Sequence, residues 1–437
     1  MRVGLERSDG DAVGRVLDTV WRMESPRLIA GLTRITRDVG LAEDLAQDAM
    51  ASAVQQWPRD GVPDNPAAWL MAVAKRRAVD HVRRSITLER RQAELGRDLE
   101  LGQATEADLD DALDNAAIGD DMLRLIFICC HPVLSIEARV ALTLRLLGGL
   151  RTDEIARAFL VSEATIAQRI VRAKRTLAEA RVPFEVPTGA DFDARLASVF
   201  QVLYLVFNEG YSATSGDDWI RPALCEDSLR LGRVLAGLVP NAAEVHGLVA
   251  LMELQASRMH ARVGPGGTPI PLAEQNRTRW DRLLIGRGMA SLARAEALGG
   301  ARGPYALQAA IAAIHAGART PEETDWRGIV ALYDALGQLM PSPIVELNRA
   351  VAVSMAFGPA AGLELVDGLV TDPALAAYHL LPAVRGDLLA KLGRYGEAAM
   401  ELVRAANMTR NQPERALLLD RAASNAALDT RDPGRLQ

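Results

Sequence analysis

The chain has 437 residues, of which 49% are hydrophobic but only 4% are aromatic, and its formal net charge is −6 at pH 7. Because alanine and leucine supply most of the apolar residues, these totals favour an all-α protein with more than one domain. They exclude a uniformly basic nucleic-acid-binding protein, and three cysteines (Cys129, Cys130 and Cys225) are too few for a disulfide framework.

The sequence also lacks the marks of a secreted or membrane protein. Its first residues, MRVGLERSDGD, contain no apolar signal core. No apolar run reaches the ~18 residues needed to span a bilayer. We therefore expect a cytoplasmic protein without a membrane segment.

The first predicted unit, residues 11–84, is a bundle of helices. Apolar residues recur at helical spacing in four stretches, which are 13–21, 26–37, 41–57 and 66–84. Asn65 followed by Pro66 predicts the start of the last helix, because asparagine caps helices and proline suits their first position.

Charge is distributed unevenly over this bundle. The helix over 41–57 is expected to carry its acids and an amide outward, namely Glu43, Asp44, Gln47 and Asp48. The helix over 66–84 combines a tryptophan with basic residues, namely Trp69, Lys75, Arg76, Arg77, Arg83 and Arg84. The acidic face suits a basic protein surface, and the basic face suits nucleic-acid phosphates. A bundle with solvated charges is the plainer alternative.

An acidic segment, 85–117, follows the bundle. It has few large apolar residues, and acids dominate its second half, namely Glu94, Asp98, Glu100, Glu106, Asp108, Asp110, Asp111 and Asp114. This composition predicts a flexible or partly helical linker.

The next predicted unit, 118–181, ends in two helices joined by a short turn, GLRTDEIARAFLVSEATIAQRIVRAKRTL (149–177). Thr152 and Ser162 are the expected helix caps. The second helix has an apolar face and a polar face, the latter with Thr165, Gln168, Arg169, Arg172 and Lys174. Such a helix is typical of one that lies in the major groove of DNA. An ordinary helical hairpin with a solvated basic face is the alternative.

Three stretches in this order resemble bacterial RNA polymerase sigma factors of the extracytoplasmic-function (ECF) type. They are GLAEDLAQDAM (40–50), NPAAWLMAVAKRRAVDHVRR (65–84) and the hairpin over 149–177. The resemblance implies that residues 11–84 are sigma region 2 and that residues 118–181 are sigma region 4. One departure is Leu160, at a turn position where many helix-turn-helix units have glycine.

The resemblance also implies roles for the charged faces. Asp44, Gln47 and Asp48 are expected to bind core RNA polymerase. The basic helix with Trp69 is expected to read the −10 element of a promoter, and the polar face of the second hairpin helix to read the −35 element.

Residues 193–300 form a predicted helical extension that ordinary members of that family lack. Helices are expected over 195–208, 222–238, 242–262 and 272–297. The loop between the first two, FNEGYSATSGDDW (207–219), offers Asn208, Glu209 and Tyr211 as a candidate ligand-binding or regulatory site. A capped connection between helices is the alternative.

Residues 301–430 contain a helical repeat. The stretches 349–369 and 384–406 align at an offset of 35 residues, close to the 34 of tetratricopeptide repeats. This predicts a tetratricopeptide-like α-helical solenoid, which presents a concave surface to peptides or proteins; a generic helical bundle is the alternative. The whole layout resembles a subgroup of ECF sigma factors in which such an extension controls activity.

No set of residues demands catalysis, a metal or a cofactor. The glycine loop over 264–271 lacks the Gly-Lys-Ser/Thr of a phosphate-binding loop, and Cys129–Cys130–His131 has no second cluster at zinc spacing. We therefore predict a non-enzymatic sigma factor whose partners are core RNA polymerase, promoter DNA and a protein or small-molecule regulator at the C-terminal half. The alternatives are a one-component, ligand-sensing helix-turn-helix regulator and a scaffolding tetratricopeptide protein.

Overall fold

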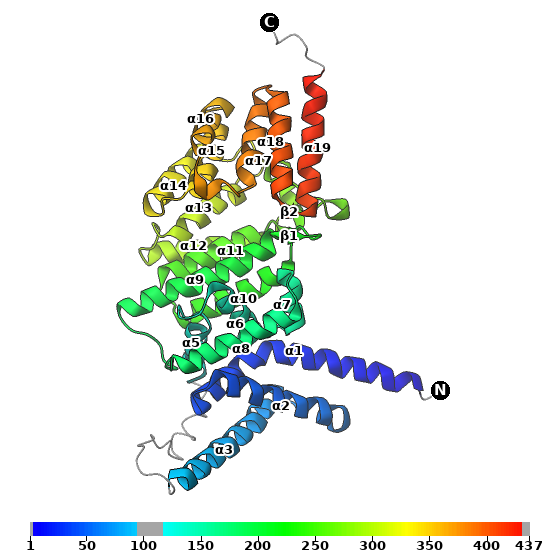
Figure 1. Ribbon diagram of the computed structural model, residues 1–437, viewed down its shortest axis with the longest axis vertical. Coiled ribbons are helices and arrows are strands. Elements are labelled where there is room, and N and C mark those ends of the chain that lie inside the picture. Colours follow the sequence, from blue (N-terminus) through cyan, green and yellow to red (C-terminus); the bar gives the residue numbers. More distant parts are fainter. Residues whose placement is uncertain (1–2, 94–116, 431–437) are drawn as a thin grey trace. The chain divides into compact units, whose positions relative to one another are not determined.

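The computed structural model describes residues 3–93 and 117–430 of the chain (Figure 1). Within these ranges nearly all regular structure is helical, and the two strands, β1 and β2, have two residues each. The prediction of an all-α fold is confirmed. None of the helices in the described ranges has the length and apolar character required to cross a bilayer. Contacts divide the chain into two compact units, Met1–Leu203 (unit 1) and Tyr204–Gln437 (unit 2).

Unit 1 begins with three helices, which are α1 (Val3–Thr36), α2 (Val39–Asp60) and α3 (Pro66–Ala93). The prediction of two separate helices over 13–21 and 26–37 is wrong, because α1 is continuous through Pro26. Proline lacks a backbone donor, but Pro26 and the neighbouring Leu28 and Ile29 are all buried. Packing therefore keeps the helix intact across the missing hydrogen bond.

Side-chain caps set the starts of α2 and α3. Asp38 Oδ1 accepts hydrogen bonds from the backbone N–H of Gly40 (2.7 Å) and Leu41 (3.0 Å). Asn65 Oδ1 accepts one from Ala68 N–H (3.0 Å), so the predicted cap of α3 is confirmed. α3 continues through 85–93, which the sequence assigned to the linker. The acids of the predicted linker, Glu94 to Asp114, lie outside the described residues.

Four further helices complete the hairpin-bearing part of unit 1, namely α5 (Ala117–Cys129), α6 (Ile136–Leu146), α7 (Thr152–Phe159) and α8 (Glu163–Glu179). The start of α9 (Ala190–Tyr211) is bonded to this part. Ser198 Oγ donates to the carbonyl of Cys130 (2.5 Å), and Arg195 donates to the carbonyl of Phe127 (3.1 Å). The division between the two units falls within α9, after Leu203.

Unit 2 continues with α10 (Pro222–Leu238), α11 (Ala243–Ala256) and α12 (Arg282–Ala297). The predicted helix over 272–297 is wrong at its start, because short 3-10 turns occupy 272–274 and 277–279. The reason is local capping, since Asn276 accepts from Thr278 N–H (3.0 Å) and Asp281 accepts from Leu283 N–H (2.8 Å). α11 likewise ends before the predicted 262, at a 3-10 turn over 259–261.

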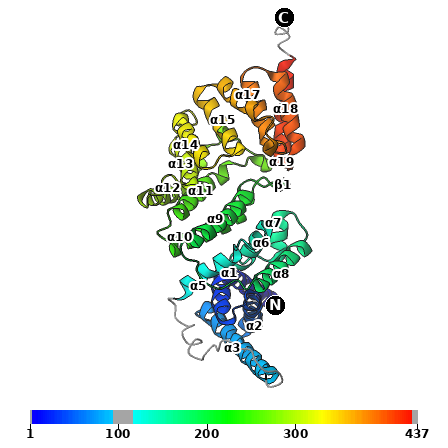
Figure 2. The same cartoon turned by 60° about the vertical axis from the view of Figure 1, so that its left-hand side comes forward.

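The rest of unit 2 is a series of helices in which each contacts the next along the chain (Figure 2). They are α13 (Pro304–Gly317), α14 (Trp326–Leu339), α15 (Pro343–Phe357), α16 (Pro359–Leu369), α17 (Leu380–Lys391), α18 (Tyr395–Met408) and α19 (Gln412–Asp429). Packing between sequence neighbours is typical of solenoids. Gly358 and Gly393, which the repeat aligns, follow α15 and α17 with positive φ angles of 103° and 74°. The tetratricopeptide-like character of these helices stays a prediction.

One contact in unit 2 joins residues that are nearly 200 positions apart. β1 (Ser215–Gly216) pairs in parallel with β2 (Arg410–Asn411). The buried side chain of Asn411 donates hydrogen bonds to the carbonyls of Ala213 (3.0 Å) and Asp218 (2.8 Å). The loop after α9 is therefore tied to the segment that leads into α19.

Candidate nucleic-acid interface

The two helices of the α7–α8 hairpin bury the apolar residues that the helical spacing of the sequence predicts. Ile155 and Ile166 are fully buried, and Ile170 is nearly so. Ser162 Oγ accepts from Thr165 N–H (3.1 Å), so the predicted cap of α8 is confirmed. The predicted Thr152 cap of α7 is wrong. Glu154 reaches back to Arg151 N–H (2.8 Å), which places the cap one residue earlier.

The turn of the hairpin is closed by Leu160 in a left-handed conformation, with φ 50° and ψ 43°. Glycine adopts this conformation freely, whereas a residue with a Cβ is strained there. Leu160 is 52% exposed, so little burial offsets the strain. Leu160 therefore differs from the common turn residue only in its type. Its backbone has the left-handed conformation that glycine adopts in other helix-turn-helix units.

The polar face of α8 is only partly available to a ligand. Gln168 and Arg172 are exposed, and Thr165 and Arg169 are half-buried. Lys174 points elsewhere, because its Nζ forms an ion pair with Glu43 Oε2 of α2 at 2.5 Å. Val171, which the charged pattern does not single out, is 64% exposed and lies three residues beyond Gln168. Helical spacing from Gln168 is the signal that points to it.

The acidic face of α2 is exposed at Asp44, Gln47 and Asp48, as the spacing predicts. The expectation that Glu43 also points outward is wrong, because Glu43 is 2% exposed. Its carboxylate accepts from Gln47 Nε2 (2.7 Å) on the same helix and from Arg145 Nε (2.6 Å) on α6. The helical pattern of α2 alone does not reveal partners that lie about a hundred residues away.

The basic face of α3 is exposed at Arg76, Arg83 and Arg84, whereas Lys75 and Arg77 are half-buried. Arg77 donates to Ser52 Oγ (2.8 Å) and lies 3.4 Å from Asp48, both on α2. Trp69 packs edge-on against Trp57, with 5.6 Å between the ring centroids. The acidic and basic faces therefore meet at Arg77 and Asp48.

The loop after α9 in unit 2 uses its polar residues internally. Glu209 is bonded to Arg221 and to the Thr214 hydroxyl (2.9 Å). The Tyr211 hydroxyl accepts from Arg258 (2.7 Å), and the guanidinium of Arg262 lies 3.7 Å from the centre of its ring. The carbonyl of Asn208 accepts from Ser212 N–H (2.8 Å). This supports the reading of the loop as a capped connection, and ligand binding at it stays a prediction.

The three cysteines are free and buried. Burial raises the pKa of Cys130 to about 11 and that of Cys225 to about 12, so both thiols are protonated at neutral pH. Cys130 Sγ lies 3.5 Å from Thr143 Oγ1 at the end of α5. Within the described ranges, no three histidine, cysteine or acidic side chains are placed to hold a metal ion.

Comparison with known proteins follows the same division of the chain. Residues 20–85 match Sigma-70 region 2, residues 124–177 match Sigma-70, region 4, and residues 195–296 match a family of unknown function (DUF6596). An uncharacterized protein of Rhizobium meliloti (strain 1021) is 44% identical over 407 residues, which cover 92% of this chain and 95% of that protein. The chain belongs to the same family as this protein. Below, α1–α3 are called region 2 and α5–α8 are called region 4.

More distant relatives match the first part of the chain. The probable ECF RNA polymerase sigma factor SigI of Mycobacterium tuberculosis is 27% identical over 170 residues, 39% of this chain and 57% of that protein. The ECF RNA polymerase sigma factor SigK of Mycobacterium ulcerans is 29% identical over 157 residues, 35% of this chain and 78% of that protein. No solved structure matches the chain. Together with regions 2 and 4, these relatives support an ECF-type sigma factor.

Proposed function

We propose that this protein is a sigma factor of the ECF type, which brings core RNA polymerase to specific promoters and has no enzymatic activity. The observation that carries the proposal is the presence of sigma-70 regions 2 and 4 in order along one chain. The structure supplies each region with an exposed polar face suited to a partner.

Region 2 supplies two of these faces. On α2, Asp44, Gln47 and Asp48 bind basic groups of core RNA polymerase through exposed carboxylate and amide oxygens. On α3, Arg76, Arg83 and Arg84 neutralise phosphates near the −10 element, and Trp69 supplies an aromatic ring for a base. The half-buried Lys75 and Arg77 flank this basic face.

Region 4 supplies the face that reads the −35 element. Gln168 and Arg172 are exposed on α8, and Thr165 and Arg169 border them. Glutamine pairs with two atoms of adenine, and arginine pairs with two atoms of guanine, in the major groove. Lys174 joins this set only when it is released from Glu43.

Run-off transcription with core RNA polymerase and the full-length chain tests the proposal on a promoter selected from genomic DNA. Arg172→Ala should reduce promoter-specific transcript and DNA affinity by about tenfold to a hundredfold, because one base contact is worth about 1–3 kcal/mol. The matched control is Arg157→Ala, since Arg157 is exposed on α7 and pairs locally with Asp153 (3.0 Å).

Two results of this experiment count against a sigma factor. Absence of any promoter-specific transcript with wild-type protein contradicts it directly. Sequence-specific DNA binding without dependence on core polymerase favours instead a one-component regulator that binds an operator.

We also propose that unit 2 controls the activity of unit 1 by binding a protein or small-molecule regulator. Its chain of neighbour-packed helices supports this, because such arrays present extended binding surfaces. A truncated protein ending at Leu203 is the test. It keeps Arg195 and Ser198, whose side chains donate hydrogen bonds to region 4. A truncation directly after α8 would remove both residues. If the truncated protein gives as much transcript as the full-length chain under all conditions, unit 2 does not control unit 1.

A further inference from the structure

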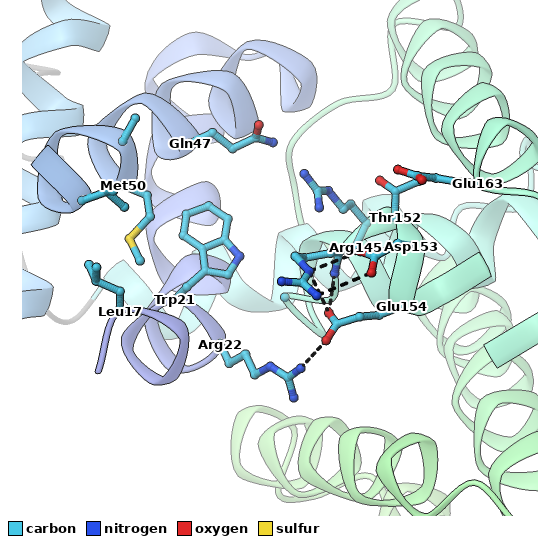
Figure 3. A pocket seen from close by; sticks show the side chains of 14 residues that line it. Leu17, Trp21, Arg22, Gln47, Met50, Arg145, Thr152, Asp153, Glu154 and Glu163 are labelled. Atoms are coloured by element: carbon cyan, nitrogen blue, oxygen red, sulfur yellow. Dashed lines mark hydrogen bonds and ion pairs between the residues drawn. The ribbon is translucent and has the colours of Figure 1, made fainter. Parts of the chain in front are cut away.

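Three arginines of unit 2, Arg258, Arg262 and Arg277, form no ion pair with any residue that the structure describes. They differ in this from arginines around a cavity of about 750 Å³ in unit 1, where Arg22 pairs with Glu154 at 2.7 Å (Figure 3). Because an arginine keeps its proton in a folded protein, the three side chains bring three positive charges together.

The three arginines alternate with aromatic rings. The resulting arginine stack consists, in spatial order, of Trp219, Arg262, Tyr211, Arg258, Trp280 and Arg277. The shortest distance from a guanidinium to a ring centre is 3.7 Å, for Arg262 and Tyr211, and the others are 5.1–5.8 Å. Aromatic faces attract cations, so the rings hold the guanidinium groups in place without neutralising them.

Two 3-10 turns that contact each other supply the arginines. Arg258 and Arg262 flank the turn over 259–261, and Arg277 begins the turn over 277–279. Arg277 is fixed further by the carbonyls of His315 and Ala318, each of which accepts a hydrogen bond from it at 2.9 Å. These acceptors are neutral, so they position the guanidinium and leave its charge uncompensated.

The stack also contains buried N–H groups without an acceptor. Nε of Arg262 and Arg277 and Nε1 of Trp219 and Trp280 are buried and have no hydrogen-bond partner among the described residues. Arg277 and Trp280 are only 6% and 3% exposed, and buried donors are normally paired. A group of donors fits a ligand that only accepts hydrogen bonds, such as a deprotonated oxyanion, better than a water molecule, which also donates.

The electrostatics of the surroundings favour an anion as well. Burial, followed by the charge of Arg258, lowers the pKa of Arg277. Burial and the charges of Arg258 and Arg277 lower the pKa of His315 to about 4, so this histidine is neutral at pH 7. The exposed Glu322 and Glu323 act on Arg277 in the opposite sense, but neither forms an ion pair with it. Positive charge therefore dominates at the stack.

We propose that the arginine stack binds a phosphate group, either as inorganic phosphate or as part of a phosphate ester. Arg258 and Arg262 are half-buried, so a ligand reaches part of each side chain. A guanidinium donates two parallel hydrogen bonds to phosphate oxygens. A phosphate monoester carries about −1.5 to −2 charges at pH 7 and so offsets more of the three positive charges than a single carboxylate does. A regulatory role for this ligand rests on the proposed control of unit 1 by unit 2, whereas its binding to the stack does not.

Calorimetric titration of the full-length chain measures the binding. Inorganic phosphate and glycerol 3-phosphate are the two probes, and sodium chloride keeps the ionic strength constant so that screening alone gives no signal. Saturable binding is expected with a Kd of about 1 mM or below for one of them, and the tighter probe shows whether the free anion or the ester is preferred. Arg258→Gln should weaken it by about tenfold to a hundredfold, the loss expected for a hydrogen bond to a charged group.

Arg279→Gln is the control for the change in charge. Arg279 is exposed on the same 3-10 turn as Arg277 and lies outside the stack, so its replacement should leave the affinity unchanged. Arg258→Lys keeps the charge but loses the planar fork, and it should bind with intermediate affinity. If circular dichroism shows that Arg258→Gln is unfolded, Arg258→Lys takes its place in the comparison. The proposal is overturned if neither probe binds saturably, or if the Arg258 and Arg279 variants weaken binding equally.

Run-off transcription with and without the tighter probe then tests the regulatory role. The amount of transcript should change with the anion for the native chain and stay constant for Arg258→Gln. A transcript from the native chain that does not respond to the anion overturns the regulatory role. If the chain gives no promoter-specific transcript at all, the proposed function fails, while the titrations still decide whether the stack binds phosphate.

Discussion

The two units use ion pairs in different ways. In unit 1 the buried carboxylates pair across long sequence separations, which are 87 residues for Asp121 and Arg34 and 102 for Glu43 and Arg145. In unit 2 the nearly buried pair of Glu209 and Arg221 spans only 12 residues. Two exposed pairs there link neighbouring helices, with separations of 15 residues for Arg349 and Asp334 and 18 for Arg385 and Asp367.

Because of this difference in sequence separation, the ion pairs of the two units stabilise the protein in different ways. A buried pair between distant segments holds two bodies together, and its loss releases one body from the other. A surface pair between neighbouring helices adds a small increment to a contact that apolar packing already makes. Arg349 and Arg385 stand 36 residues apart and each pairs with an aspartate of the preceding helix, so unit 2 repeats one small increment. Arg421, 36 residues further on, pairs instead with Asp387, two helices earlier.

Asp121→Ala is expected to have the largest effect on stability. It removes a nearly buried carboxylate that binds Arg34 (2.8 Å) and Arg124 (2.7 Å), at a cost of about 3 kcal/mol. Hydrogen exchange resolved by segment should show the loss in α1 and α5, because the two units need not unfold together. Asp120→Ala, at the exposed neighbouring acid, is the control and should change nothing measurable. If Asp121→Ala and Asp120→Ala show equal protection from hydrogen exchange, the buried carboxylate of Asp121 does not stabilise unit 1.

Asn411→Ala tests an exception in unit 2, the polar contact that joins residues nearly 200 positions apart. The substitution leaves the carbonyls of Ala213 and Asp218 without this donor and removes the cap at Glu414 N–H (3.1 Å). The expected loss is about 2–3 kcal/mol, seen as faster exchange in 212–221 and at the start of α19. Asn425→Ala, which loses a bond within α19 only, is the control. Exchange that rises in α19 but not in 212–221 shows that the tie does not hold the loop.

Acid should weaken the contact between regions 2 and 4. Because the pKa of Glu43 is depressed in the folded state, its contribution is complete above its ordinary value of 4.5 and is lost as the pH falls through the lower folded value. Each unit of depression is worth about 1.4 kcal/mol. Burial raises the pKa of Asp121, so protonation of Asp121 acts in the opposite sense and offsets part of the loss.

Urea unfolding of unit 1 at a series of pH values below 4.5 measures this dependence. Glu43→Gln removes the titrating group and should flatten the curve in this range. A wild-type curve that is already as flat as that of Glu43→Gln contradicts the assignment.

Much of the fold was predictable because local signals were consistent. The caps at Asn65 and Ser162, the apolar stripe of α8 and the helix ends before Gly358 and Gly393 all depend on residues close in sequence. The continuous α1 was not predictable in this way, because burial of Pro26 is a tertiary property. The start of α12 was missed because the apolar pattern concealed the Asp281 cap.

The candidate interfaces were predictable as residue types, but the partners of those residues were not. Gln168, Arg172 and Asp44 are exposed as their helical faces imply. Glu43 and Lys174 looked like members of two separate charged faces, yet they bind each other. A helical wheel shows which side of a helix a residue occupies, and it does not show which other domain covers that side.

Arg349→Gln is expected to have the smallest effect, about 0.5 kcal/mol. Arg349 binds Asp334 (2.6 Å) and Glu346 (2.9 Å), but these acids are 49% and 39% exposed, so water replaces the lost bonds. Urea unfolding of unit 2 measures it, and Arg349→Lys, which keeps the charge, is the control. Arg349→Gln could instead destabilise unit 2 as strongly as Asp121→Ala destabilises unit 1. In that case the ion pairs of the arginines at 36-residue spacing stabilise the helices of unit 2 cooperatively. The contrast between the units would then rest on sequence separation alone and not on burial.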